Sequence, residues 1–176
     1  MKRYAVLFLM AMMVLVIPTS AQAKTLKLSY IERETLSASR FVDADNSGTN
    51  GAPTSGDYFV GASNLYAIKA HNKPGKRVGK VTFKVIFSEV TQTTYKMRLT
   101  AKATLPGGHV YVDNTQTGKV SEDEGPSQMG DVERYPIKRG DGRYKGYTGS
   151  VTITVLKPGD DQQTPEISRD VFKLKK

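Results

Sequence analysis

Two glutamates and a tyrosine occupy positions where the alternation of apolar residues would turn a side chain toward a protein interior. Glu32 shares the parity of Leu28 and Tyr30, and Glu89 continues the parity of Phe87. Burial favours the neutral form of a carboxyl group, so such a group can polarise or deprotonate a bound molecule. We therefore predict Tyr30, Glu32 and Glu89 as catalytic residues. The alternative is that both glutamates lie at or beyond their strand ends and are solvated.

A second set of residues has the chemistry to contact an apolar or aromatic ligand. Tyrosine combines an apolar ring with one hydroxyl that can donate a hydrogen bond, and aliphatic, thioether and phenyl groups complete an apolar pocket. For each tyrosine the alternative is core packing, because aromatic residues often fill protein cores. The predicted ligand-binding residues are Asn64, Tyr66, Val85, Phe87, Tyr95, Met97 and Tyr111.

The sequence lacks the residues that several common kinds of catalytic site require. The sequence has no cysteine, and its two histidines, His71 and His109, provide neither a zinc cluster nor, without a nucleophile motif, a catalytic triad. No glycine-rich phosphate loop opens a helix. We therefore predict no metal and no cofactor. Asp43-x-Asp45-x-Ser47-Gly48 imitates half of an EF-hand loop, but Thr54 stands where the bidentate glutamate belongs. A weak calcium loop and a flexible polar loop remain alternatives for it.

The first 23 residues have the features of a cleavable export signal. Lys2 and Arg3 give a basic start, residues 5–17 form an uncharged apolar stretch, and Ala21-Gln22-Ala23 fits the small-x-small cleavage pattern. The apolar stretch is shorter than the roughly 20 residues that span a bilayer, so we predict no membrane span. The mature chain, residues 24–176, is then one domain that is secreted or periplasmic.

The net charge limits the partners. The full chain carries +9, which falls to +7 when Lys2 and Arg3 leave with the signal. This balance favours anionic envelope components such as lipopolysaccharide or acidic polysaccharide, whereas export argues against nucleic acid. The alternative is that scattered charges simply form a solvated face. Five cations that would share one outer wall are Lys80, Lys84, Lys96, Arg98 and Lys102.

Apolar and polar residues alternate with period two along most of the mature region, which predicts strands rather than helices. Glycine- and proline-rich turns separate these stretches. Eight short strands of this kind favour a closed antiparallel barrel or a sandwich, and an eight-stranded barrel has room for side chains or one small ligand. Two longer polar stretches, 43–56 and 115–131, are predicted to be loops near the barrel mouth. The predicted strands are 26–30, 57–68, 81–87, 95–104, 109–113, 132–137, 144–156 and 167–174.

Three segments, in order along the chain, resemble one protein family. The first is Leu28-Ser29-Tyr30-Ile31-Glu32-Arg33-Glu34, and the second runs from Gly56-Asp57 through Leu65-Tyr66 to Lys76-Arg77-Val78-Gly79. The third, from Tyr135 to Val151, contains the spaced glycines Gly140, Gly142, Gly146 and Gly149, which permit positive φ or close backbone approach. Together the segments resemble the allene oxide cyclase family and the dirigent-like barrels.

The resemblance implies an eight-stranded barrel with a largely apolar cavity, assembled as a homotrimer. The activities known in such barrels are stereocontrolled cyclisation of a fatty-acid epoxide and stereoselective coupling or cyclisation of phenolic intermediates. Two residues depart from the family pattern: its first-strand glutamate aligns with Tyr30, and its cavity cysteine aligns with Val85. Its asparagine before Leu-Tyr corresponds to Asn64. The fold therefore carries over more safely than fatty-acid epoxide chemistry.

We therefore predict an all-β, eight-stranded antiparallel barrel that holds a small hydrophobic or phenolic molecule and directs a cofactor-free cyclisation or isomerisation. The alternative is a non-enzymatic envelope or extracellular protein that binds through its basic outer surface. The two hypotheses differ in the barrel interior. A ligand-binding barrel leaves an open apolar lumen, whereas a scaffold barrel is packed solid by Phe83, Phe87, Tyr95, Met97 and Leu99.

Overall fold

This computed structural model describes residues 24–46, 53–119, 127–159 and 163–176. They contain nine β-strands and three short 3-10 helices. β-branched and aromatic residues in alternation favour such strands, and turn-forming residues separate them. In chain order the elements are β1 (Thr25–Glu34), η1 (Leu36–Ala38), β2 (Arg40–Val42), β3 (Tyr58–Ile68), η2 (Ala70–Asn72), β4 (Pro74–Ser88), β5 (Thr94–Leu105), β6 (Gly108–Lys119), β7 (Val132–Gly140), η3 (Gly142–Tyr144), β8 (Thr148–Lys157) and β9 (Ile167–Lys175).

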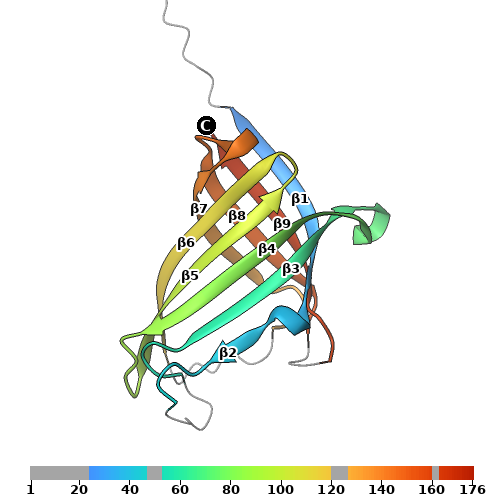
Figure 1. Ribbon diagram of the computed structural model, residues 1–176. Helices are drawn as coiled ribbons and strands as arrows, with labels where there is room; N and C mark the ends of the chain where they lie inside the picture. The colour runs from blue at the N-terminus through green and yellow to red at the C-terminus, as the bar shows by residue number, and fades with distance from the viewer. Residues whose placement is uncertain (1–23, 47–52, 120–126, 160–162) are drawn as a thin grey trace, which may run out of the picture.

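Eight of these strands close into an antiparallel barrel (Figure 1). From β3 to β9 each strand pairs with its neighbour in the chain, and β1 closes the ring because it pairs with β9 on one edge and with β3 on the other. β2 is additional: it continues along the edge of β3 that β1 leaves, with Phe41 opposite Phe59. The predicted eight-stranded antiparallel barrel is confirmed.

One end of the barrel is filled with side chains. Alternate residues of each strand point inward, so that Leu65 of β3, Val110 of β6 and Phe172 of β9 are at most 2 % exposed. Tyr144 of η3 joins this buried cluster, and its hydroxyl donates to the carbonyl oxygen of Pro106 at 2.9 Å. The filled end lies at the top of Figure 1, near the C-terminus. Its packing holds the strands in register for the rest of the barrel.

The segment before β8 differs from the sequence-based prediction. A strand was predicted over 144–156, but β8 begins only at Thr148 because Gly142–Tyr144 forms η3. Gly142 has a φ of +54°, in the left-handed region that glycine adopts without strain. At Gly149 a Cβ atom would collide with the carbonyl oxygen of Lys173 in β9, so the two strands approach closely there.

Other strand ends also differ from the prediction. β6 continues to Lys119, so residues 115–119 are strand and not part of a loop. The reason is that β5 and β6 remain paired along their whole length, as far as Thr94 opposite Lys119, and backbone hydrogen bonds extend the ladder through polar residues. β4 begins at Pro74, in the stretch between the predicted strands 57–68 and 81–87, and the three-residue β2 is too short for alternation to predict it.

All nine strands belong to a single sheet. Within the described ranges, no helix has the length and apolar character needed to cross a membrane. The predicted signal peptide, residues 1–23, and Ser47 and Gly48 of the EF-hand-like motif lie outside those ranges.

Candidate functional site

The barrel contains a cavity of about 490 Å³ at the end opposite the filled core. This volume lies in the range of small-molecule sites. All eight barrel strands contribute lining residues, because every strand turns its alternate side chains inward. The lumen is therefore open at this end and packed at the other, and it does not match the interior of a solidly filled scaffold.

One wall of the cavity is apolar and comes from β4 and β5. Val81, Phe83 and Val85 alternate along β4, and Met97, Leu99 and Ala101 alternate along β5. The Phe83 ring lies over Gly61 of β3, where a Cβ atom would collide with it, and it packs 5.9 Å from the Phe59 ring. Glycine at position 61 thus makes room for a large ring in the cavity wall.

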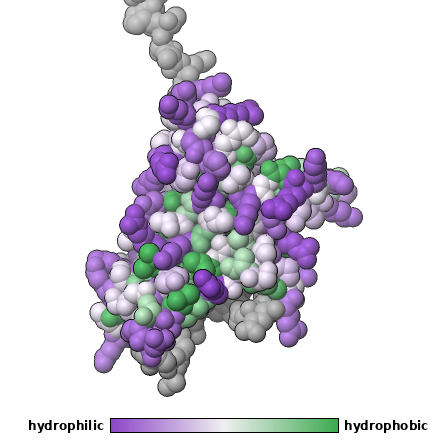
Figure 2. Space-filling view, in the orientation of Figure 1, coloured by the Kyte–Doolittle hydropathy of each residue, from purple (hydrophilic) through white to green (hydrophobic). Residues whose placement is uncertain are grey.

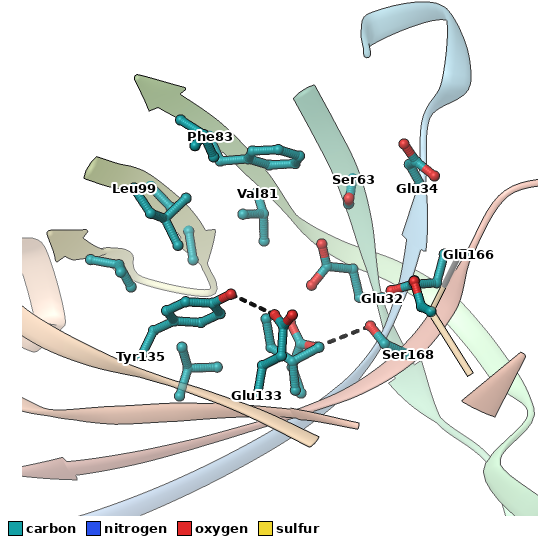
Figure 3. A pocket seen from close by; sticks show the side chains of 18 of the residues that line it. Glu32, Glu34, Ser63, Val81, Phe83, Leu99, Glu133, Tyr135, Glu166 and Ser168 are labelled. Atoms are coloured by element: carbon teal, nitrogen blue, oxygen red, sulfur yellow. Dashed lines mark hydrogen bonds between the residues drawn. The ribbon is translucent and has the colours of Figure 1, made fainter. Parts of the chain in front are cut away.

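The opposite side of the cavity carries carboxyl groups (Figure 3). Hydroxyl groups donate to several of them: Tyr135 to Glu133 Oε2 at 2.5 Å, and Ser127 to Glu166 Oε2 at 2.6 Å. The Ser168 hydroxyl lies 3.4 Å from a carboxylate oxygen of the buried Asp170. The acidic lining residues are Glu32 and Glu34 of β1, Glu133 of β7, Glu166 before β9, and Asp170 of β9.

Two of these carboxyl groups have raised pKa values. Burial raises the pKa of Asp170 well above its usual range, and the Glu32 carboxyl, which is hydrogen-bonded to it, raises that pKa further. Burial also raises the pKa of Glu166, and the nearby carboxyl groups of Glu133, Glu32 and Glu34 raise it further. The hydrogen bond from Ser127 acts in the opposite direction and lowers this pKa. Closely spaced carboxyl groups resist full ionisation because their charges repel in a poorly solvated site.

This arrangement can donate and accept protons beside an apolar surface. Asp170, whose pKa is raised, retains its proton at pH values where an isolated aspartate has lost it. A neutral carboxyl group next to an apolar pocket can act as a general acid, and a nearby carboxylate can act as a base. The geometry therefore supports acid–base chemistry on a molecule held against Phe83 and Leu99.

Three of the residues predicted from the sequence line this cavity: Glu32, Val85 and Met97. Tyr30 lies deeper, in the filled end, where its ring meets Phe172 edge-on at 6.0 Å between centroids. Burial raises the pKa of the Tyr30 hydroxyl. The catalytic roles of Tyr30 and Glu32 and the ligand-binding roles of Val85 and Met97 stay predictions.

Phe87 and Tyr95 pack against each other beside the cavity lining. Their ring centroids are 5.7 Å apart in an edge-on arrangement, and the Phe41 ring of β2 lies 6.5 Å from that of Phe87. The Tyr95 ring also lies over Gly118, where a Cβ atom would collide with it. These aromatic residues form a small cluster near the end of the barrel that carries the cavity.

The remaining predicted residues do not lie in the cavity. Asn64 donates from Nδ2 to the Thr35 hydroxyl at 3.2 Å, and Tyr66 follows the inward-facing Leu65 and so belongs to the outer face. Glu89 follows the end of β4 in a turn with a φ of +50°, where its side chain is 65 % exposed and pairs with Lys96 at 2.5 Å. The continued parity that suggested Glu89 is interrupted because the strand has ended.

Tyr111 also lies on the outer face, in a small polar cluster. Its hydroxyl donates to Asp141 Oδ2 at 2.7 Å, and the other carboxylate oxygen of Asp141 lies 2.7 Å from His109 Nδ1. The Arg139 guanidinium stacks on the Tyr111 ring at 3.7 Å. Hydrogen bonds from Tyr111 and His109 lower the pKa of Asp141. This cluster fastens β6 to the end of β7 and is separate from the cavity.

Three aspartates in the predicted loop 43–56 and at its end come together. One carboxylate oxygen from each of Asp43, Asp45 and Asp57 lies within 4.8 Å of the others. The buried Asp57 accepts hydrogen bonds from the backbone N–H groups of Ala44 at 2.8 Å and Thr54 at 2.6 Å, and these lower its pKa. The Asp57 oxygens therefore hold the turn together, and the calcium alternative stays untested.

Sequence reasoning missed Glu133, Glu166 and Asp170. Strand parity was the available signal for two of them: Asp170 alternates with Phe172 in a predicted strand, and Glu133 alternates with Tyr135 in another. An acidic residue at a core position is unusual and marks a candidate site. Glu166 precedes its strand and carries no such signal.

Comparisons with known proteins agree on the fold. No family model and no curated protein matches the chain. Among solved structures it is similar to a pyocyanin demethylase (TM-score 0.52, 16 % identity, covering 84 % of this chain and 99 % of the other). It is also similar to the pterocarpan synthase dirigent protein GePTS1 (TM-score 0.59, 12 % identity, covering 87 % of this chain and 90 % of the other). A third similar structure is AbnU, an exo-specific intermolecular Diels-Alderase (TM-score 0.53, 17 % identity, covering 87 % of this chain and 99 % of the other).

These similarities extend over most of each chain while sequence identity stays low, so they concern the architecture. This chain therefore has the barrel fold of the dirigent proteins and cyclase barrels, as its sequence resemblance predicted.

Proposed function

We propose that this chain holds a small hydrophobic or aromatic molecule in its lumen and directs a cofactor-free cyclisation or isomerisation of it. The observation that carries the proposal is the cavity itself, which sets an apolar wall of β4 and β5 opposite a group of carboxyl groups that includes the buried Asp170. Similar solved structures named as a Diels-Alderase and as a pterocarpan synthase dirigent protein support ring formation as the reaction class.

The two walls have different tasks in this proposal. The apolar wall, with Phe83 and Leu99, binds the ligand by burying its hydrocarbon surface and restricts it to one folded conformation. The Glu32–Asp170 pair supplies a proton at one ligand atom and takes a proton back from another. Such a rearrangement changes neither the composition nor the oxidation state of the ligand, so its atoms and electrons balance without a co-reactant.

A binding experiment tests the first half of the proposal. The purified protein is melted in the presence of phenols, terpenoids, fatty acids and epoxy fatty acids. A ligand that occupies the lumen raises the melting temperature, and at one hundred times its Kd it adds about 2.7 kcal/mol to the free energy of unfolding. Any ligand that binds is then incubated with the protein, and chiral chromatography shows whether a cyclised or isomerised product forms with an enantiomeric excess.

A pair of variants locates the binding. Ala101→Phe places a ring inside the lumen, whereas Thr100→Phe places the same ring on the outer face of the same strand. The proposal expects the first variant to lose the ligand-induced shift and the second to keep it. A shift that survives Ala101→Phe, or no shift with any apolar class, contradicts a ligand-holding lumen.

A second candidate function uses the outer surface. Lys80, Lys84 and Lys102 alternate on the outer face of β4 and β5, and on the face shown in Figure 2 hydrophilic residues surround a central area of neutral and hydrophobic ones. This arrangement favours binding to anionic envelope polymers. Salt-sensitive binding of an acidic polysaccharide that Ala101→Phe leaves unchanged would support it.

The cellular location follows from the sequence alone in this proposal. We propose export through the signal in residues 1–23, which would place the barrel in the periplasm or outside the cell. Fractionation of cells expressing the full chain, with mass spectrometry of the N-terminus, checks cleavage after Ala23. The predicted homotrimer is checked by light scattering on the same material.

A further inference from the structure

The charge of the lumen is opposite to that of the whole protein. The described lining of the cavity contains five carboxyl groups and no lysine, arginine or histidine. The full chain nevertheless carries a net charge of +9. Its cations are therefore kept out of the cavity lining, while acidic side chains from β1, β7, β9 and the residue before β9 converge on it.

None of the carboxyl groups that line the cavity forms an ion pair with a described residue. The three ion pairs of the described chain join Lys96 to Glu89, Arg98 to Asp113 and His109 to Asp141, all outside the cavity lining.

The hydroxyl donors to the lumen carboxyl groups are neutral: those of Tyr135, Ser127 and Ser168, described above, and that of Ser39, which donates to Glu34 Oε1 at 2.8 Å. Hydroxyl donors satisfy the oxygen lone pairs but leave the charge uncompensated.

Crowding of these groups has an electrostatic cost that a positive ligand removes. Asp170 is 1 % exposed, and Glu32 lies beside it. The raised pKa values of Asp170 and Glu166 report the burial and the mutual repulsion of the carboxyl groups. A positive charge placed among them is attracted by each carboxyl group that is ionised, and it favours the ionised form of those that are protonated.

The spacing of the lumen carboxyl groups fits an extended organic cation better than a metal ion. In the described chain, one set of three acidic or histidine side chains lies close enough to share an ion, and it is Asp43, Asp45 and Asp57 outside the lumen. No three of the lumen carboxyl groups lie as close together as that set, and they share the cavity with the hydrocarbon surface of Phe83 and Leu99. A metal ion cannot bury hydrocarbon surface against these side chains, whereas an aromatic cation can contact both the apolar wall and the carboxyl groups.

We propose that the ligand of the lumen is an organic cation with an apolar or aromatic body, such as an aryl amine or an N-heteroaromatic cation. This inference rests on the proposed function, because it specifies the charge of the molecule that the lumen holds. The cationic group lies among Glu32, Glu166 and Asp170, and the body packs against the apolar wall.

Three probes of matched size test the charge preference. They are 1-naphthylmethylamine, 1-naphthylmethanol and 1-naphthoate, which are respectively positive, neutral and negative at pH 7. Isothermal titration calorimetry of each with the purified protein is expected to give a Kd for the amine at least about tenfold below that of the alcohol, with the naphthoate weakest. Glu166→Gln and Asp170→Asn should each reduce the amine-to-alcohol preference several-fold. Asp113→Asn, which removes a carboxyl group on the outer surface, should not.

The outcomes separate this inference from the proposed function. Equal binding of amine and alcohol, both lost in Ala101→Phe, overturns the cationic preference and leaves a ligand-holding lumen intact. Tightest binding of the naphthoate overturns it in the same way. Amine binding that Ala101→Phe does not weaken is surface attraction, and it overturns both, as does the failure of all three probes to bind.

A measurement on the unmodified protein keeps the inference testable if the variants fail to fold. A bound cation favours the ionised form of Asp170, so binding of the amine is expected to release protons, and binding of the alcohol is not. Calorimetry in two buffers with different ionisation enthalpies measures the number released. Amine binding without proton release, or proton release of equal size with the alcohol, contradicts the assignment.

Discussion

Replacement of Asp170 by asparagine tests the raised pKa of the buried carboxyl group directly. The change keeps the size of the side chain and its contact with Ser168, and it removes the titration. Because the folded-state pKa of Asp170 lies above its ordinary value of 3.8, the folded protein retains this proton after the unfolded chain has released it. Stability from this group is therefore fully present below pH 3.8 and is lost as the pH rises toward the folded-state pKa.

The magnitude follows from proton linkage. Across that pH window one group that is protonated only in the folded state lowers the free energy of unfolding by up to about 1.4 kcal/mol per pH unit. Asp170→Asn removes this slope, so the variant gains stability relative to the wild type as the pH rises. Glu166, whose pKa is also raised, remains in the variant and supplies a residual slope of the same sign.

Urea unfolding at a series of pH values from 3.5 to about 8, at constant ionic strength, measures the effect. Far-ultraviolet circular dichroism is the suitable signal because the chain has no tryptophan. The aspartates with lowered pKa values, such as Asp57, act in the opposite direction and below pH 3.8, outside this window. Parallel stability curves for the two proteins from pH 4 upward would refute a raised pKa at Asp170.

Three further substitutions test the packing around the cavity and mouth. Gly61→Val forces the Phe83 ring away from β3, so we expect a loss of about 1–3 kcal/mol in the free energy of unfolding and altered selection among apolar ligands; unchanged urea curves would contradict this contact. Asp57→Ala removes the acceptor of two backbone N–H groups, and we expect the melting temperature to fall by several degrees; an unchanged value would show that the turn does not depend on it. Glu89→Gln breaks an exposed ion pair with Lys96, and calorimetry is expected to show unchanged ligand binding; weakened binding would return Glu89 to the site.

Strand alternation predicted the barrel well because closure requires it of every strand. Inward and outward residues must alternate along every strand of a closed barrel. The alternation of Met97, Leu99 and Ala101 therefore indicated the closed fold as well as the strand. The strand ends were less predictable, since hydrogen bonding to a neighbouring strand extended β6 through polar residues that alternation alone assigns to a loop. Turn glycines were recognised, but η3 depends on tertiary packing of Tyr144.

The site was only partly predictable, because parity gives the face of a strand but not what lies across the barrel. Glu32 was predicted on parity and lines the cavity, whereas Glu89 had the same signal and lies in an exposed turn. Asp170 shares the parity of Phe172, which was a signal for an inward position. Val171 obscures this signal because it is also apolar and lies on the opposite face of the strand. The approach of Asp170 to Glu32 arises from pairing between the first and last strands, which are distant in sequence.

The two walls of the lumen come from different parts of the gene. The apolar wall lies in one continuous hairpin, β4 and β5, while the carboxyl groups come from the first strand and the last third of the chain. A mutational library confined to residues 81–101 would therefore vary the shape of the pocket and leave Glu32, Glu133, Glu166 and Asp170 untouched. The apolar wall and the carboxyl groups can thus diverge separately during evolution, and a single exchanged hairpin is enough to recombine them.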